Sequence, residues 1–146
     1  MDVAAPERAD VWREKGRLMV TADQLVAHVV GDYVLQSDWM AAHKSRRSLP
    51  ALVHAALYSV PFLFLSPSSL ALLIIFGSHF VIDRWRLARY VSWATNLLAP
   101  LPHRSWAECQ ATGYAPERPL WMAQWLLVIV DNTLHVLINA WALALH

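Results

Sequence analysis

Acidic and imidazole side chains occur in pairs, four residues apart, inside stretches of the sequence that are otherwise almost wholly apolar. The pairs are His28 with Asp32, His79 with Asp83, and Asp131 with His135. A spacing of four places both side chains on one helical face, one turn apart. Ionisable groups in apolar surroundings are costly unless they have partners, and a metal ion is one such partner. The pattern therefore favours helices that meet around a shared polar centre.

The composition narrows the class of protein. Hydrophobic residues make up 57% of the 146-residue chain and charged residues 16%, against about 45–50% and about 25% in typical soluble domains. Eight tryptophans are present, and tryptophan is enriched at membrane interfaces. The single cysteine, Cys109, excludes a disulfide within the chain. No basic stripe with interleaved aromatic residues occurs, which argues against nucleic-acid binding.

Helix start and stop signals predict four apolar helices. Thr21 begins a capping box, Pro50 and Pro119 suit the first turn of a helix, and Ser66 or Ser68 is a candidate N-cap. The expected helices cover residues 21–36, 50–65, about 69–89 and 119–145. We expect a polar segment over residues 37–48 and a long irregular loop over residues 92–118.

The expected fold is all-α: an up-and-down four-helix bundle that spans a membrane several times. The last helix, at about 27 residues, is long enough to cross a bilayer. Residues 1–20 are interpreted as a polar, amphipathic leader without the features of a cleavable signal peptide, and residues 21–146 as one helical domain. Lysine and arginine in the segments after the first and third helices favour a cytoplasmic location for both segments, with both chain ends outside. A compact soluble bundle with an apolar surface is the alternative.

On this topology the polar side chains of four helices converge at one end, because late positions on odd helices meet early positions on even ones. Seven candidate metal ligands result: His28, Asp32, His54, His79, Asp83, Asp131 and His135. Imidazole and carboxylate ligands suit one or two Zn²⁺, Mn²⁺ or Fe²⁺ ions, the second bridged to the first by an aspartate. The alternatives are buried hydrogen-bonded pairs without metal, or a proton relay.

Other polar residues fall into two further groups. Gln24, Gln36, Tyr58 and Asn139 share helical faces with the candidate ligands and are expected to orient them. Lys44, Arg84 and Arg86 are candidates for binding an anionic or lipid-like substrate, although arginines at this place are also typical membrane anchors. Asp32 and Asp83 are the candidates for a general base.

The sequence resembles a known family in three segments. They are His28-Val-Val-Gly-Asp32-Tyr-Val-Leu-Gln36-Ser-Asp38-Trp-Met40, His79-Phe-Val-Ile-Asp83-Arg-Trp85, and Asp131 to His135, with Lys44 and His54 between the first two. This arrangement resembles small bacterial and phage membrane proteins grouped as domain of unknown function 3307. More distantly, it is similar to membrane-bound metal-dependent hydrolases, a similarity that implies metal binding by the same seven residues.

The function expected from these features is metal-dependent hydrolysis of a phosphoester or similar bond, in an amphiphilic or small anionic substrate. The expected location is a bilayer, either a bacterial inner membrane or the membrane of a phage-infected host, with homo-oligomerisation possible. Two alternatives use the same residues. One is a transporter or a protein that conducts protons or metal ions, and the other is a non-catalytic membrane protein of the interaction or lysis type.

Overall fold

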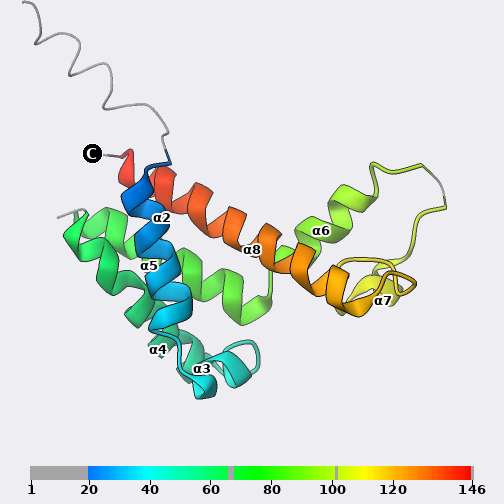
Figure 1. Cartoon of the computed structure of the whole chain (residues 1–146), viewed down its shortest axis with the longest axis horizontal. Helices are drawn as coiled ribbons and strands as arrows, with labels where there is room; N and C mark the ends of the chain where they lie inside the picture. Colours follow the sequence, from blue (N-terminus) through cyan, green and yellow to red (C-terminus); the bar gives the residue numbers. More distant parts are fainter. Residues whose placement is uncertain (1–19, 66–67, 101, 146) are drawn as a thin grey trace, which may run out of the picture.

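The computed structural model describes residues 20–65, 68–100 and 102–145, and these residues form helices and no strands (Figure 1). The elements are α2 (Ala22–Val29), η1 (Val30–Val34), α3 (Asp38–His43), α4 (Ser48–Ser59), η2 (Val60–Phe64), α5 (Ser69–Trp85), α6 (Ala88–Asn96), α7 (Trp106–Cys109) and α8 (Leu120–Leu143). The predicted all-α class is confirmed. The predicted leader, apart from Val20, lies outside the described residues.

The predicted helix starts agree with the structure. Thr21 and Gln24 form the expected capping box, in which each side chain accepts a hydrogen bond from the other residue's backbone N–H. The Ser68 hydroxyl caps α5 by accepting from the backbone N–H of Ala71, while Ser66 lies outside the described residues. Pro119 directly precedes α8.

The first predicted helix contains a change of helix type. After Val29 the chain continues as the π-helix η1, which has one more residue per hydrogen-bonded ring than an α-helix. Gly31 lies in this segment, directly against α4. A Cβ atom at Gly31 would be 2.7 Å from the carbonyl oxygen of Tyr58 and 2.9 Å from its Cδ2. Glycine therefore allows η1 to approach α4 closely, and Asp32 follows it at the contact.

The third predicted helix ends earlier than expected. Arg86 adopts the left-handed conformation, with φ 52° and ψ 51°, and the N–H of Leu87 donates to the carbonyl of Ile82 at 2.9 Å. This hydrogen bond is typical of a Schellman helix end, which satisfies the last carbonyls and turns the chain. The prediction that the helix continues to Arg89 is wrong, because α5 ends at Trp85 and a separate helix, α6, begins at Ala88.

Two predicted irregular segments also contain helices. The polar segment 37–48 holds α3, whose first turn the Ser37 hydroxyl caps by accepting from the N–H of Met40. The predicted loop 92–118 begins inside α6 and includes the short helix α7. The sequence signals for α3 and α7 are the local caps at Ser37 and Ser105 rather than apolar periodicity, which is why the apolar pattern did not predict these two helices.

The four helices predicted from the sequence correspond to α2 with η1, α4 with η2, α5 and α8, and these elements pack around one core. α5 contacts both α4 and α8, and α2 contacts α8, while α6 packs along the other part of α8 (Figure 1). More than half of the buried hydrophobic residues are alanines, such as Ala51 and Ala55 on α4 and Ala140 on α8. Small residues at these contacts allow close approach of the helix backbones, as in helix pairs within membranes.

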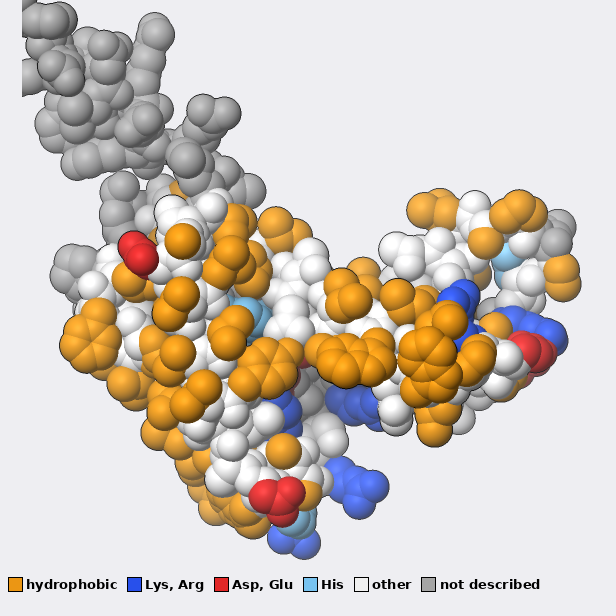
Figure 2. Space-filling view, viewed as in Figure 1, with side chains coloured by type: hydrophobic (Ala, Val, Ile, Leu, Met, Phe, Trp, Pro, Cys, Tyr) orange, Lys and Arg blue, Asp and Glu red, His pale blue; other side chains and the backbone are white. Residues whose placement is uncertain are grey.

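Large apolar side chains lie mostly on the outside. Figure 2 shows hydrophobic side chains over much of the visible face. The exposed apolar side chains of α8 include Trp121, Trp125 and Trp141, each more than half exposed. Among the described residues one helix, α8, is long and apolar enough to cross a membrane, with 24 residues and a mean hydropathy of 1.6. The helical segment Ser48–Phe64 is apolar but shorter. One candidate span is less than the several predicted from the sequence.

Candidate metal centre

A first group of buried ligand atoms joins three elements of the core. Asp32 comes from η1, His54 from α4, and His79 with Asp83 from α5, and one ligand atom of each lies within 4.8 Å of the others. The Nε2 atom of His54 is 3.1 Å from Oδ1 of Asp32 and 3.3 Å from Oδ2 of Asp83. The four residues are all buried. Two imidazoles and two carboxylates that converge in this way match the ligand set of a transition-metal ion.

A second group shares Asp83 with the first. It consists of Asp83, Asp131 and His135, and the two latter residues lie one turn apart on α8. The Nε2 atom of His135 is 3.5 Å from Oδ1 of Asp83 and 3.5 Å from Oδ2 of Asp131. His135 is 1% exposed at its side chain and Asp131 is 28% exposed. The second group therefore extends from the buried core towards solvent.

Lys44 places a positive charge against the first group. Its Nζ is 2.8 Å from Oδ2 of Asp83, 3.7 Å from Oδ1 of Asp32, and 3.1 Å from Nε2 of His54. Burial lowers the pKa of the Lys44 ammonium, but the Asp83 and Asp32 carboxylates raise this pKa by more, so the net shift is upwards. Lys44 is therefore a permanent cation at neutral pH, bound to oxygens that would also bind a metal ion.

A hydrogen-bonded chain lies behind the imidazoles. The Tyr58 hydroxyl is 2.9 Å from Nδ1 of His28 and accepts from the Asn139 side-chain amide at 2.6 Å. His28 Nε2 lies 2.6 Å from the side-chain oxygen of Asn132, which requires the proton of a neutral His28 ring to be on Nε2. The ring of Tyr58 stacks on that of His79. Tyr58 thereby fixes the position of a candidate ligand.

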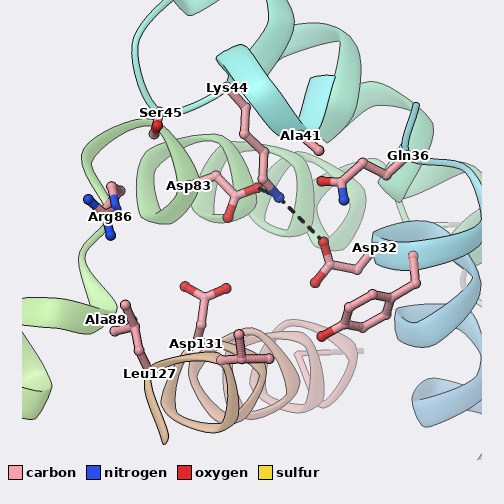
Figure 3. Close-up of a pocket in the computed structure, with 12 residues that line it drawn as sticks. Asp32, Gln36, Ala41, Lys44, Ser45, Asp83, Arg86, Ala88, Leu127 and Asp131 are labelled. Atoms are coloured by element: carbon pink, nitrogen blue, oxygen red, sulfur yellow. Dashed lines mark ion pairs between the residues drawn. The ribbon is translucent and has the colours of Figure 1, made fainter. Parts of the chain in front are cut away.

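A pocket of about 320 Å³ opens beside the two groups (Figure 3). Its lining includes all three carboxylates of the centre, Asp32, Asp83 and Asp131, and the cations Lys44 and Arg86. Leu127 and Val128 of α8 form an apolar part of the wall. Figure 3 shows the Asp32 and Asp131 carboxylates directed into the space between η1, α5 and α8. The pocket thus combines acidic, basic and apolar surfaces within reach of the ligand groups.

Six of the seven predicted ligands belong to the two groups, and His28 belongs to neither. Both ring nitrogens of His28 have hydrogen-bond partners, and its ring centroid lies 6.1 Å from that of His135. His28 therefore lies beside the candidate ligands, but its ring nitrogens do not converge with their ligand atoms.

The remaining predicted site residues are distributed more widely. Gln36 lines the pocket, whereas Gln24 caps α2. Arg84 donates to the Ser48 hydroxyl and to the Ser45 carbonyl, and it is not among the residues that line the pocket. Of the three predicted cations, Lys44 and Arg86 lie at the pocket.

Two polar residues at the centre were missed by the sequence interpretation. Asn132 accepts from His28 and also exchanges hydrogen bonds with the hydroxyl of Tyr33. Tyr33 follows His28 by five residues, a spacing that shares a face in a π-helix but not in an α-helix. Gly31 is the one sequence feature that indicates η1. The position of Asn132 directly after Asp131 could have indicated that Asn132 lies at the centre.

Comparisons with known proteins identify one match. A family model described as "Protein of unknown function (DUF3307)" matches residues 20–138. The matched segment contains both ligand groups, Lys44 and Arg86. No curated protein and no solved structure matches the chain.

Proposed function

The chain belongs to the DUF3307 family, whose description gives no activity, and we propose that the protein is a membrane-embedded, metal-dependent hydrolase. Its substrates are amphiphilic or small anionic molecules with a phosphoester or related bond. The observation that carries this proposal is the convergence of six buried or half-buried ligand residues, three of which line an open pocket.

The membrane location is supported by the distribution of side-chain sizes, because small side chains are buried and large apolar side chains are exposed. Alanines predominate in the core, whereas large apolar side chains on every long helix are exposed, for example Val26, Leu63, Leu73 and Trp125. Large apolar patches on a protein surface often mark contacts with lipid or with other proteins. Lipid contact removes the cost of that exposure, and α8 supplies a helix of spanning length.

Support for a metal comes from the charge and from the donor set. The two carboxylates of the first group, Asp32 and Asp83, are 8% and 4% exposed at their side chains, and the ammonium of Lys44 supplies one positive charge against them. Buried carboxylates are costly unless paired, so a divalent ion would supply the missing charge. A divalent ion bound there would act as a Lewis acid and lower the pKa of a water ligand.

In the proposed hydrolysis, Asp32 acts as the general base. One oxygen of Asp32 faces Lys44 and the other faces the pocket, where it accepts a proton from the attacking water (Figure 3). The water oxygen forms a bond to phosphorus while the bond from phosphorus to the ester oxygen breaks. The departing alkoxide then takes up the proton from Asp32, so the carboxylate is regenerated.

The cations and the apolar wall of the pocket bind the substrate. Arg86 and Lys44 line the same pocket as the carboxylates, and they would neutralise the phosphate oxygens of a bound substrate. Leu127 and Val128 lie on the α8 side, where a hydrocarbon chain contacts them. This combination favours a substrate with a charged head and an apolar part.

The proposal is tested by metal content and turnover of one protein preparation. The full chain, purified in detergent, is predicted to contain at least one equivalent of Zn, Mn or Fe by elemental analysis, and to hydrolyse a panel of phosphoesters. His79→Gln is predicted to lose both properties, while the matched control His103→Gln, at an exposed imidazole outside the centre, keeps them. Less than a tenth of an equivalent, with no gain after Zn²⁺ or Mn²⁺ addition, contradicts the proposal.

A further inference from the structure

The carboxylate of Asp83 presents its two oxygens to different ligand groups. Oδ2 is 3.2 Å from Nε2 of His79 and 3.3 Å from Nε2 of His54, both in the first group. Oδ1 is 3.5 Å from Nε2 of His135, in the second group. A carboxylate in this orientation can bind one cation through each oxygen.

Several buried atoms at these contacts lack hydrogen-bond partners. Among the described residues they include Nε2 of His79 in the first group and Nε2 of His135 in the second, whereas Oδ2 of Asp83 has the Lys44 ammonium 2.8 Å away. The side chains of His79 and His135 are each 1% exposed. Unpartnered buried polar atoms are rare in native proteins because each costs about 1–3 kcal/mol. Nε2 of His79 and Nε2 of His135 lie 3.2 Å and 3.5 Å from oxygens of Asp83 without forming hydrogen bonds, and a cation bound between each pair of atoms would satisfy both.

We propose that the centre holds two divalent cations bridged by Asp83, a closed one in the first group and an open one in the second. This inference rests on the proposed function and specifies its metal centre. The first group offers four protein ligands, as structural and tightly held ions usually have. The second offers three, Asp83, Asp131 and His135, so one coordination position is left for water or substrate.

The position of the second group relative to the pocket determines which ion meets the substrate. Asp32, Asp83 and Asp131 all line the pocket, but Asp131 is 28% exposed at its side chain, whereas Asp32 is 8% and Asp83 4% exposed. The ion in the second group therefore lies on the substrate side. The first ion supports it through the shared carboxylate of Asp83.

Manganese spectroscopy on the full chain in detergent tests this arrangement. Loaded with Mn²⁺, the protein is expected to bind two equivalents and to give the electron paramagnetic resonance spectrum of a spin-coupled pair. The double variant Asp131→Asn with His135→Gln should bind one equivalent with an uncoupled six-line spectrum. The control Asp23→Asn with His103→Gln, outside both groups, should retain two coupled ions. Circular dichroism checks that each variant folds.

The outcomes separate this inference from the proposed function. One equivalent in the native protein, or two uncoupled ions, overturns the bridged pair, and turnover of phosphoesters by such a protein would leave the hydrolase proposal intact. Two coupled ions that persist after Asp131 and His135 are both replaced also overturn it. Two coupled ions without turnover of any phosphoester support the bridged centre and contradict the hydrolase.

Discussion

The ring of Tyr58 stacks on the imidazole of His79, with centroids 3.6 Å apart and planes 17° apart. The same residue holds His28 and Asn139 through its hydroxyl. One buried side chain therefore has two separable roles: the ring positions a candidate ligand, and the hydroxyl satisfies polar atoms behind it.

Two substitutions at Tyr58 are expected to separate these roles. Tyr58→Phe keeps the stacked ring but leaves His28 Nδ1 and the Asn139 amide without a partner, so the free energy of unfolding should fall by about 1–3 kcal/mol, with Zn²⁺ affinity nearly unchanged. Tyr58→Leu also removes the stacking, worth about 0.5–1.5 kcal/mol, so Zn²⁺ affinity should fall severalfold. Thermal unfolding and metal titration in detergent measure both effects. Equal metal affinity in the two variants would contradict the role assigned to the ring.

Gly31→Ala is expected to disrupt the centre, although Gly31 itself supplies no candidate ligand. The added Cβ would overlap the Tyr58 carbonyl oxygen and ring, so η1 must move and carry Asp32 away, at a cost of about 1–3 kcal/mol. Gly77→Ala is the matched control on α5, because a Cβ atom added there would have no atom within 4 Å beyond its own stretch of helix. It should raise stability by about 0.5–1 kcal/mol, since alanine favours helix over glycine. Unfolding curves that rank the two variants the other way would contradict the packing account.

Lys44→Met is expected to raise the affinity of the first group for Zn²⁺ at least tenfold. The ammonium lies against the oxygens of Asp83 and Asp32, where it competes with a divalent ion, and its raised pKa keeps it charged at neutral pH. Competition with a chromophoric chelator measures the affinity. Arg47→Met, at an exposed residue that provides no side-chain cap to α4, controls for the loss of a nearby charge. Weaker metal binding by Lys44→Met would show that the lysine assists the ion instead.

Arg86→Gly tests whether the side chain of Arg86 has a function that accounts for an arginine in this left-handed backbone conformation. Arg86 is the one non-glycine residue with positive φ among the described residues, and glycine would adopt this conformation freely. Relief of strain and loss of the hydrogen bond to the Ala111 carbonyl are each worth about 1 kcal/mol and should nearly cancel. Stability should therefore hold while kcat/KM for a phosphoester falls at least tenfold. Arg46→Gln, at an exposed cation, is the control, and unchanged kcat/KM in Arg86→Gly would exclude Arg86 from substrate binding.

The sequence predicted those parts of the centre that depend on regular helix geometry. The spacing of four between His79 and Asp83, and between Asp131 and His135, placed each pair on one face, and the structure keeps both pairs together. Thr21 and Pro119 marked helix starts through local hydrogen bonding and a fixed φ angle, which operate within a few residues.

The remaining features depend on tertiary contacts. In the π-helix η1, Gly31 lies directly against Tyr58 of another helix, and a local sequence pattern does not predict a contact between residues so far apart in the chain. The early end of α5 requires the left-handed Arg86, a conformation that sequence patterns assign to glycine. His28 shares the pattern of the ligands, yet Asn132, 104 residues away, takes the nitrogen that would have faced a metal.

The proposed divalent ion would be bound where the side chains of η1, α4 and α5 converge. Crystals of the Zn²⁺-loaded protein, measured on both sides of the zinc absorption edge, test it most directly. We predict an anomalous peak within about 2.0–2.2 Å of Nε2 of His79 and of an Asp83 oxygen, and a second peak beside His135. A map with no anomalous peak within reach of these side chains would contradict it.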